Sequence, residues 1–178
     1  MMGKRPARLL ALATITASTL LFGCTKDERK AAPAESSLPA TVRASIDTAV
    51  SAYEDIRVAL ADDRSNVRMQ ALTLAGAAEV ASESAPPTLR QPLDDLAVSS
   101  RGLAAIADGD LSQARTSFGD VSRALIAVLS AEPSLQPGRR VYECPMAKGY
   151  KKWVQLDDTI SNPYMGSTML QCGSEAEF

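Results

Sequence analysis

The sequence has 178 residues and a net charge of −2, with 46% hydrophobic and only 4% aromatic residues. It contains no histidine, which excludes Ser-His-Asp and Cys-His catalytic arrangements, HExxH zinc sites and every metal site built on imidazole. The acidic balance argues against nucleic acid as a partner, because nucleic-acid binding requires a basic patch. Since a Gly-rich phosphate loop is also missing from the sequence, we expect a protein that is not an enzyme.

The N-terminus has the three parts of a bacterial secretory signal peptide. Lys4, Arg5 and Arg8 make it positive, residues 9–22 form an uncharged apolar run, and residues 21–24 (Leu-Phe-Gly-Cys) close it. The apolar run is too short for a membrane-spanning helix, which needs about 20 residues. We therefore expect export from the cytoplasm.

The closing motif resembles the lipobox of bacterial lipoproteins. The resemblance implies removal of residues 1–23 and a lipid on the sulfur of Cys24, with enough acyl chains to anchor the protein stably in a membrane. The residue that follows Cys24 is Thr25 rather than Asp, and this resembles the default signal for sorting to the outer membrane. The alternative is an ordinary signal peptide with a chance cysteine. We expect a lipid-anchored protein on the periplasmic side of the bacterial cell envelope, at the outer membrane.

Residues 24–39 are polar and rich in Ala, Pro and Ser, so they bury too little apolar surface to order themselves. We expect a flexible tether that reaches roughly 20 Å. Because three of the 19 basic residues lie in the signal peptide, the mature chain is more acidic than the whole sequence. Residues 40–178 are long enough for a single domain with a hydrophobic core.

Four apolar stripes at three-and-four spacing occupy residues 41–131 and predict amphipathic helices. Gly109 is the expected C′ residue of the third helix. Asp110 is the expected N-cap of the fourth, and Gln113 completes a spacing like that of a capping box. Short joints between such helices predict an all-α fold, an antiparallel four-helix bundle. The stripes run over residues 42–60, 67–78, 89–107 and 111–128.

The helical period disappears from Gln136 onward, and we expect residues 136–178 to form a small irregular cap rich in Cys and Met. Residues 141–144 and 153–155 look extended around a turn at Lys148, which leaves room for a short hairpin. A short irregular segment has little core of its own. Three aromatic residues should therefore pack the cap onto the bundle: Tyr142, Trp153 and Tyr164.

The cap reads Cys144-Pro145-Met146-Ala147, then Trp153, then Asn162-Pro163-Tyr164-Met165-Gly166, and finally Met169-Leu170-Gln171-Cys172-Gly173. This order resembles a domain of unknown function that occurs alone in bacterial envelope lipoproteins and also fused to periplasmic adaptor subunits of copper and heavy-metal efflux pumps. In that family an aromatic residue more often stands where this chain has Met165. The resemblance implies an association with metal handling, with an efflux adaptor or another envelope protein as partner.

The two cysteines that remain after lipidation lie among methionines. Cys144 and Met146 alternate in a predicted strand and so face one side, while Met165, Met169 and Cys172 share one stripe if that stretch is helical. Thiolates and thioethers are soft ligands that favour Cu(I). We therefore expect a metal site of Cys144, Met146, Met169 and Cys172, with Met165 as the least certain ligand, in a Cu(I) chaperone, buffer or efflux accessory.

Three other interpretations stay open. Paired cysteines in an oxidising envelope most often form a disulfide, and Cys144–Cys172 would then staple the tip of a protein-interaction module without a metal. Methionines at helical spacing are most often core filler. Zinc held by both cysteines and a carboxylate such as Asp157 is the third.

Overall fold

The computed structural model describes residues 38–106 and 108–178 of the chain. The predicted signal peptide, Cys24 with its predicted lipid, and the predicted tether as far as residue 37 lie outside the described residues. Among the residues that are described, no helix is long and apolar enough to cross a membrane. The description covers the predicted helices and the cap, apart from Ala107.

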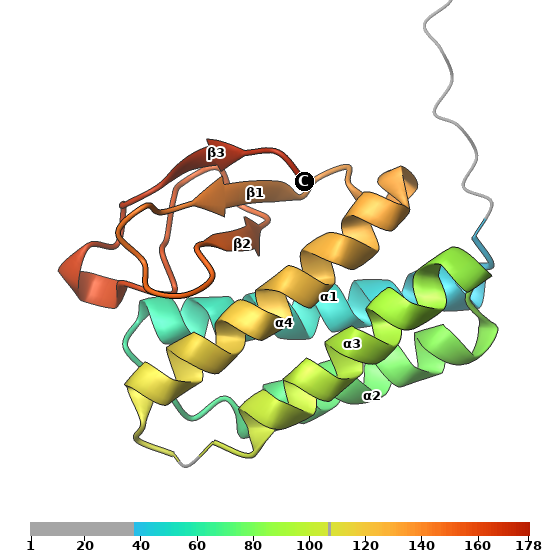
Figure 1. Cartoon of the computed structure of the whole chain (residues 1–178), viewed down its shortest axis with the longest axis horizontal. Helices are drawn as coiled ribbons and strands as arrows, with labels where there is room; N and C mark the ends of the chain where they lie inside the picture. The colour runs from blue at the N-terminus through green and yellow to red at the C-terminus, as the bar shows by residue number, and fades with distance from the viewer. Residues whose placement is uncertain (1–37, 107) are drawn as a thin grey trace, which may run out of the picture. The chain divides into compact units, whose positions relative to one another are not determined.

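Four α-helices fill the first part of the described chain, as predicted (Figure 1). They are 22, 17, 18 and 21 residues long, and the apolar stripes of the sequence supply their buried faces. Most of their stability therefore comes from packing these faces together rather than from helix propensity. In chain order they are α1 (Ala40–Ala61), α2 (Arg68–Ser84), α3 (Pro87–Ala104) and α4 (Leu111–Ala131).

The connection between α3 and α4 differs from the sequence prediction at one glycine. Asp110 caps α4 as predicted, because its Oδ1 accepts a hydrogen bond from the backbone N of Gln113 at 2.9 Å. Gly109 is not the C′ residue of α3, since that helix ends at Ala104. Gly109 has a φ of 98° and donates its N–H to Oγ of Ser65 at 2.9 Å. Its conformation thus ties this connection to the one between α1 and α2.

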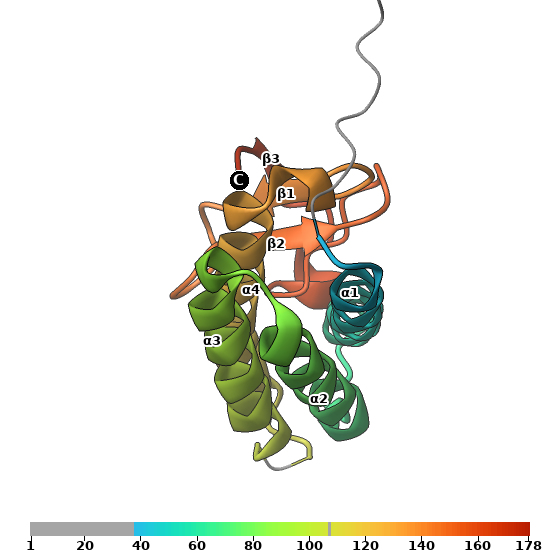
Figure 2. The same cartoon turned by 90° about the vertical axis from the view of Figure 1, so that its right-hand side faces the viewer.

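Each helix runs back along the preceding one, and contacts join α1 to α2, α2 to α3 and α3 to α4 (Figure 1). α1 and α4 touch each other far less. The C-terminal sheet covers the side between them, with strand β2 (Lys152–Gln155) packed on α4 and in contact with α1 (Figure 2). The fourth side of the bundle is therefore closed by a strand.

Three short strands of the cap form an antiparallel sheet, so the all-α class is wrong for this part of a mostly helical fold. β1 (Arg140–Glu143) lies at the centre, between β2 and β3 (Ser174–Ala176). The predicted hairpin is confirmed as β1 and β2, with Tyr142 opposite Trp153. β3 escaped prediction because its three residues are exposed or half-buried and carry no alternating apolar pattern.

The predicted packing of the aromatic residues is confirmed. Trp153 is fully buried, and Tyr142 and Tyr164 are nearly so. Ring contacts form a chain from α1 to the centre of the sheet. The centroid distances are 4.9 Å for Tyr53–Phe118, 5.9 Å for Phe118–Tyr164, 6.0 Å for Tyr164–Trp153 and 5.8 Å for Trp153–Tyr142. Since aromatic pairs stabilise beyond the area they bury, this chain of rings joins the cap to the bundle.

Two tyrosine hydroxyls take the place of a neighbouring strand along the outer edge of β2. Tyr53 Oη accepts from the backbone N of Val154 at 3.1 Å and bonds Oγ of Ser122 at 2.7 Å. Tyr164 Oη donates to the carbonyl of Lys152 at 2.7 Å. Burial raises the pKa of Tyr53 far above its ordinary value, so its hydroxyl stays neutral. Edge groups that would otherwise pair with another chain are thus satisfied from within.

Candidate interaction site at the disulfide-linked tip

Cys144 and Cys172 form a disulfide, with their Cα atoms 5.7 Å apart. The bond joins the turn after β1 to the segment before β3 and so defines the tip of the cap, residues 144–148 and 162–173. Cys144 is fully buried, whereas Cys172 is partly exposed. The sequence left a disulfide and a metal site open for these cysteines, and the structure contains the disulfide.

The methionines do not converge on the cysteines as the sequence suggested. β1 ends at Glu143, so Met146 lies in a turn and is 63% exposed, while Cys144 points inward. The prediction that both face one side is therefore wrong. The stripe of Met165, Met169 and Cys172 is wrong as well, because only a single 3-10 turn, Gly166–Thr168, forms there.

This donor set does not fit a Cu(I) or zinc site while the disulfide is intact. The thiolate is the form of cysteine that binds metals, and an oxidised pair has none. Met169, at 39% exposure, points at least partly to solvent. No three side chains of the His, Cys, Asp and Glu types gather into a metal site within residues 38–106 and 108–178. The zinc set of Cys144, Cys172 and Asp157 is thus not assembled.

A network around Arg115 of α4 fixes the tip to the bundle. Its guanidinium donates to the carbonyls of Pro163 and Leu60, both at 2.8 Å, and pairs with Asp63 at 2.6 Å. The other carboxylate oxygen of Asp63 accepts from the backbone N of Ser167 at 3.2 Å and from its hydroxyl. The bonds from Ser167, followed by the bond from Arg115, lower the pKa of Asp63 to about 2. Asp63, in the turn after α1, therefore binds both α4 and the tip.

Buried Gln155 shapes the loop that leads from β2 to the tip. Its Nε2 donates to the carbonyls of Asp157 at 2.8 Å and Thr159 at 2.6 Å. Its Oε1 accepts from the indole N–H of Trp153 at 3.2 Å and from the backbone N of Ser161 at 3.1 Å. A fully bonded amide of this kind specifies one conformation, because leaving any partner unpaired in the interior is costly.

Buried Asn162 does the same inside the tip. Its Nδ2 donates to the carbonyl of Cys172 at 2.7 Å. Its Oδ1 accepts from the backbone N of Tyr164 at 2.8 Å and of Met165 at 3.1 Å. The amide thus connects residues 162–165 to Cys172, alongside the disulfide.

A pocket of about 410 Å³ opens where the tip meets the first turns of α4. Met146 and Met165 both contribute to its wall, so two thioethers line one pocket, although they are not the predicted pair of Met146 and Met169. Lys148 is exposed, and its ammonium group makes no ion pair or hydrogen bond with the described residues. We call this site the methionine pocket; it is lined by Leu111, Ser112, Arg115, Thr116, Met146, Lys148, Tyr164 and Met165.

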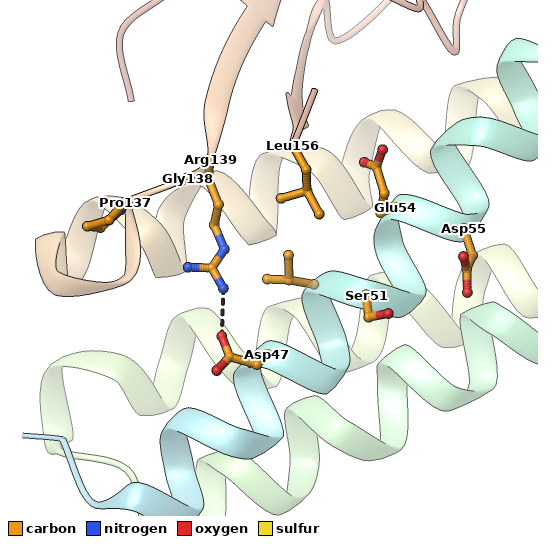
Figure 3. A pocket seen from close by; sticks show the side chains of 9 residues that line it. Asp47, Ser51, Glu54, Asp55, Pro137, Gly138, Arg139 and Leu156 are labelled. Carbon is orange, nitrogen blue, oxygen red and sulfur yellow. Dashed lines mark hydrogen bonds and ion pairs between the residues drawn. The ribbon is translucent and has the colours of Figure 1, made fainter. Parts of the chain in front are cut away.

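Two further hollows adjoin each other at the segment before β1, and the smaller one lies between this segment and α1. In the smaller one, of about 260 Å³, Arg139 reaches from that segment to Asp47 on α1, with 2.6 Å between the charged atoms (Figure 3). The larger, of about 470 Å³, contains Arg140 together with Asp158 and Glu175, and Arg140 pairs with both carboxylates. Because most of these charges are already paired, the hollows are weaker candidates for a binding site than the methionine pocket.

Sequence reasoning missed Arg115, Asp63 and the rim residue Lys148. In the sequence Asp63 only interrupts two helices, and Lys148 only marks a turn. Each acquires its place from residues far away in the chain: Asp63 and Ser167 are 104 positions apart. No local pattern reports a contact of that separation.

A scan against models of known protein families found no match, and neither did a search of curated proteins or a search of solved structures.

Proposed function

We propose that this chain is a non-enzymatic interaction module of the bacterial cell envelope, which docks a protein partner at the methionine pocket. Met146 carries the proposal: an apolar side chain with 63% exposure stands at a formed pocket, on a turn that a disulfide secures two residues away. Methionine adapts its shape to partner surfaces. Exposed apolar side chains beside a concave site favour contact with another molecule.

The surroundings of the pocket support docking, because the backbone there is already fixed. The disulfide, the Arg115 network and Asn162 hold the segments that carry Met146 and Met165. A preformed surface loses little conformational freedom when a partner binds, so more of the contact energy remains as affinity.

Site-specific photo-crosslinking in cells tests the docking. A photoreactive amino acid replaces Met146 in one variant and Met69 in a control, since Met69 on α2 has a comparable exposure of 69%. We expect a discrete protein adduct from position 146 that is lost in the Cys144→Ser/Cys172→Ser background, and none from position 69. Identical patterns from both positions would contradict the proposal.

The module is held at the outer membrane by a lipid on Cys24, a proposal that the resemblance of residues 21–24 to a lipobox supports. Mass spectrometry of the mature N-terminus should find an acylated cysteine. A Cys24→Ser protein that is still processed and bound to membranes would refute lipid anchoring.

Binding of Cu(I) by the reduced protein is the second candidate function, in a chaperone, buffer or efflux accessory. Two thioethers, Met146 and Met165, share a pocket, and reduction would add the thiols of Cys144 and Cys172 as soft ligands. The test is a competition for Cu(I) between reduced protein and a colorimetric chelator. Wild type and a Cys144→Ser/Cys172→Ser/Met146→Ser variant that compete equally poorly would end this hypothesis.

A further inference from the structure

We propose that the methionine pocket receives an apolar side chain flanked by carboxylates, so that the partner presents an acidic segment. This inference rests on the proposed docking function and adds the chemistry of the docked segment. It is carried by the charge of the pocket lining, which has two cations, Arg115 and Lys148, and no carboxylate.

The two cations are not equivalent. Arg115 is already engaged, because its Nη2 pairs with Asp63 at 2.6 Å and donates to the carbonyl of Leu60, and its Nε donates to the carbonyl of Pro163. Lys148 is exposed at the rim and has no ion-pair partner among the described residues. Its charge is therefore available to an incoming anion, and Lys148 is the specificity-determining residue.

The lining also includes Leu111 and Ser112, which lie in the first turn of α4. The N-terminus of a helix carries a partial positive charge, which favours anions nearby. Asp110 caps this helix through the backbone N of Gln113 and offsets part of that charge, but it is not in the lining. The helix end therefore adds to the effect of Lys148 without producing it.

The apolar part of the site explains why a bare anion is not the expected ligand. Leu111, Met146, Met165 and Tyr164 contribute its apolar wall, and the volume of about 410 Å³ lies within the range of small-ligand pockets. An apolar side chain removes these groups from water, while the neighbouring carboxylates meet Lys148 in solvent. Both features together define an acidic segment with an apolar anchor.

The two hollows at the segment before β1 provide a contrast within the same molecule. Their linings include the carboxylates of Asp47, Asp158 and Glu175, which already pair with the cations there, Arg139 and Arg140, so that these cations are less available to an acidic segment. The chain as a whole has a net charge of −2. An acidic partner is therefore directed away from these hollows and toward the methionine pocket, and it should bind more weakly at high salt.

Peptide binding to the full chain, held in phosphatidylcholine nanodiscs, tests the inference by fluorescence anisotropy. The probes are labelled pentapeptides with the central sequences Asp-Leu-Asp, Lys-Leu-Lys and Asp-Ser-Asp. Lys148→Glu is compared with Arg90→Glu, which changes the net charge equally at an exposed position of α3 outside the pocket. Met146→Ser is compared with Met69→Ser, and circular dichroism checks that every variant folds.

We expect the Asp-Leu-Asp peptide to bind more tightly than both other peptides. Lys148→Glu should weaken it roughly fivefold and Arg90→Glu less than about twofold, as expected for removal and reversal of one exposed charge contact. Met146→Ser should weaken it, and Met69→Ser should not. Equal or tighter binding of Lys-Leu-Lys, no binding of Asp-Leu-Asp at millimolar concentration, or equal effects of the two charge reversals would overturn the acidic assignment. The absence of any protein adduct from position 146 in cells, with both cysteines present, would instead refute the docking function itself.

Discussion

Single residues at the junction of helices and cap determine how the tip is held. Asp63 has a φ of 59°, a left-handed conformation that Asp tolerates better than most residues. This conformation presents its carboxylate to Arg115 on one side and to Ser167 on the other. Gly166, beside Ser167, also has a positive φ, of 56°. The tip therefore depends on two backbone conformations that few other residues adopt.

Gly166→Ala should destabilise the fold by about 2 kcal/mol or more, since both its φ and its surroundings oppose a side chain. A Cβ at this position would overlap Oδ1 of Asp63 and Nη2 of Arg115. Gly149→Ala is the matched control, because Gly149 has a φ of 72° but open space around it. Urea unfolding should show a loss of only about 1 kcal/mol there. Equal losses of unfolding free energy in the two variants would show that the Arg115 network rearranges to accept the added Cβ.

Asp63→Asn should reduce the sensitivity of the fold to acid. The pKa of Asp63 is lowered from 3.8 to about 2 in the folded state, so this carboxylate contributes stability above about pH 4 that is lost as the pH falls toward 2. Asn keeps the left-handed conformation accessible but has no charge to lose. Urea midpoints of wild type and variant should therefore converge between about pH 5 and pH 2. If the urea midpoints of wild type and variant differ by the same amount at every pH, the charge of Asp63 does not contribute to stability.

The elements of the fold differ in how well the sequence predicted them. The four helices were predictable because their stripes repeat within each segment and because a local hydrogen bond caps α4. The hairpin followed from two short extended runs. β3 and the turn at 166–168 could not be predicted, since β3 exists by pairing with β1 and the turn by bonding to Asp63. The expected stripe of Met165, Met169 and Cys172 did not form for the same reason: it required a helix over 165–172, where the chain makes only a single 3-10 turn.

Tyr53→Phe should destabilise the protein by about 1–3 kcal/mol, the cost of leaving buried polar groups without partners. The change leaves the backbone N–H of Val154 without its partner and removes one hydrogen bond of the Ser122 hydroxyl. Tyr142→Phe is the control, because the hydroxyl of Tyr142 only approaches the carbonyl of Asp158, at 3.4 Å. Chemical denaturation should change by less than about 0.5 kcal/mol in that variant. An unchanged free energy of unfolding in Tyr53→Phe would mean that water can replace the tyrosine hydroxyl at the edge of β2.

Removal of the disulfide by Cys144→Ala/Cys172→Ala should cost about 3–4 kcal/mol by the chain-entropy estimate, given a sequence separation of 28. Hydrogen exchange should accelerate most in residues 162–176 and by a smaller factor in α2 and α3, which contact each other rather than the cap. Uniform acceleration throughout the bundle would instead assign the disulfide a global role.

At the scale of the whole molecule, bundle and cap depend on each other. α1 and α4 hardly touch, and β2 fills the side between them. The buried chain of rings from Tyr53 to Tyr142 crosses that boundary. We therefore expect the described domain to unfold in one cooperative transition, with the helices unstable once the cap is released.

Trp153→Ala tests this dependence, because Trp153 is fully buried in the middle of the ring chain. The variant should lose about 3–5 kcal/mol, and helical circular dichroism should disappear in the same transition as the cap. Val98→Ala on α3 is the control, since Val98 is 69% exposed and should cost no more than about 0.5 kcal/mol. Two separate transitions in the wild type would show that the bundle stands alone.

The burial of Trp153 also gives the protein an optical reporter of its own. It is the single tryptophan of the chain, and Gly173, next to Cys172, lies so close that a Cβ there would be 2.8 Å from Cη2 of the indole. Indole emission shifts to longer wavelength when water reaches the ring. A reductant that opens the disulfide and frees the segment around Gly173 will therefore shift the emission of Trp153 to longer wavelength. The attachment of the tip can be followed in real time without a label.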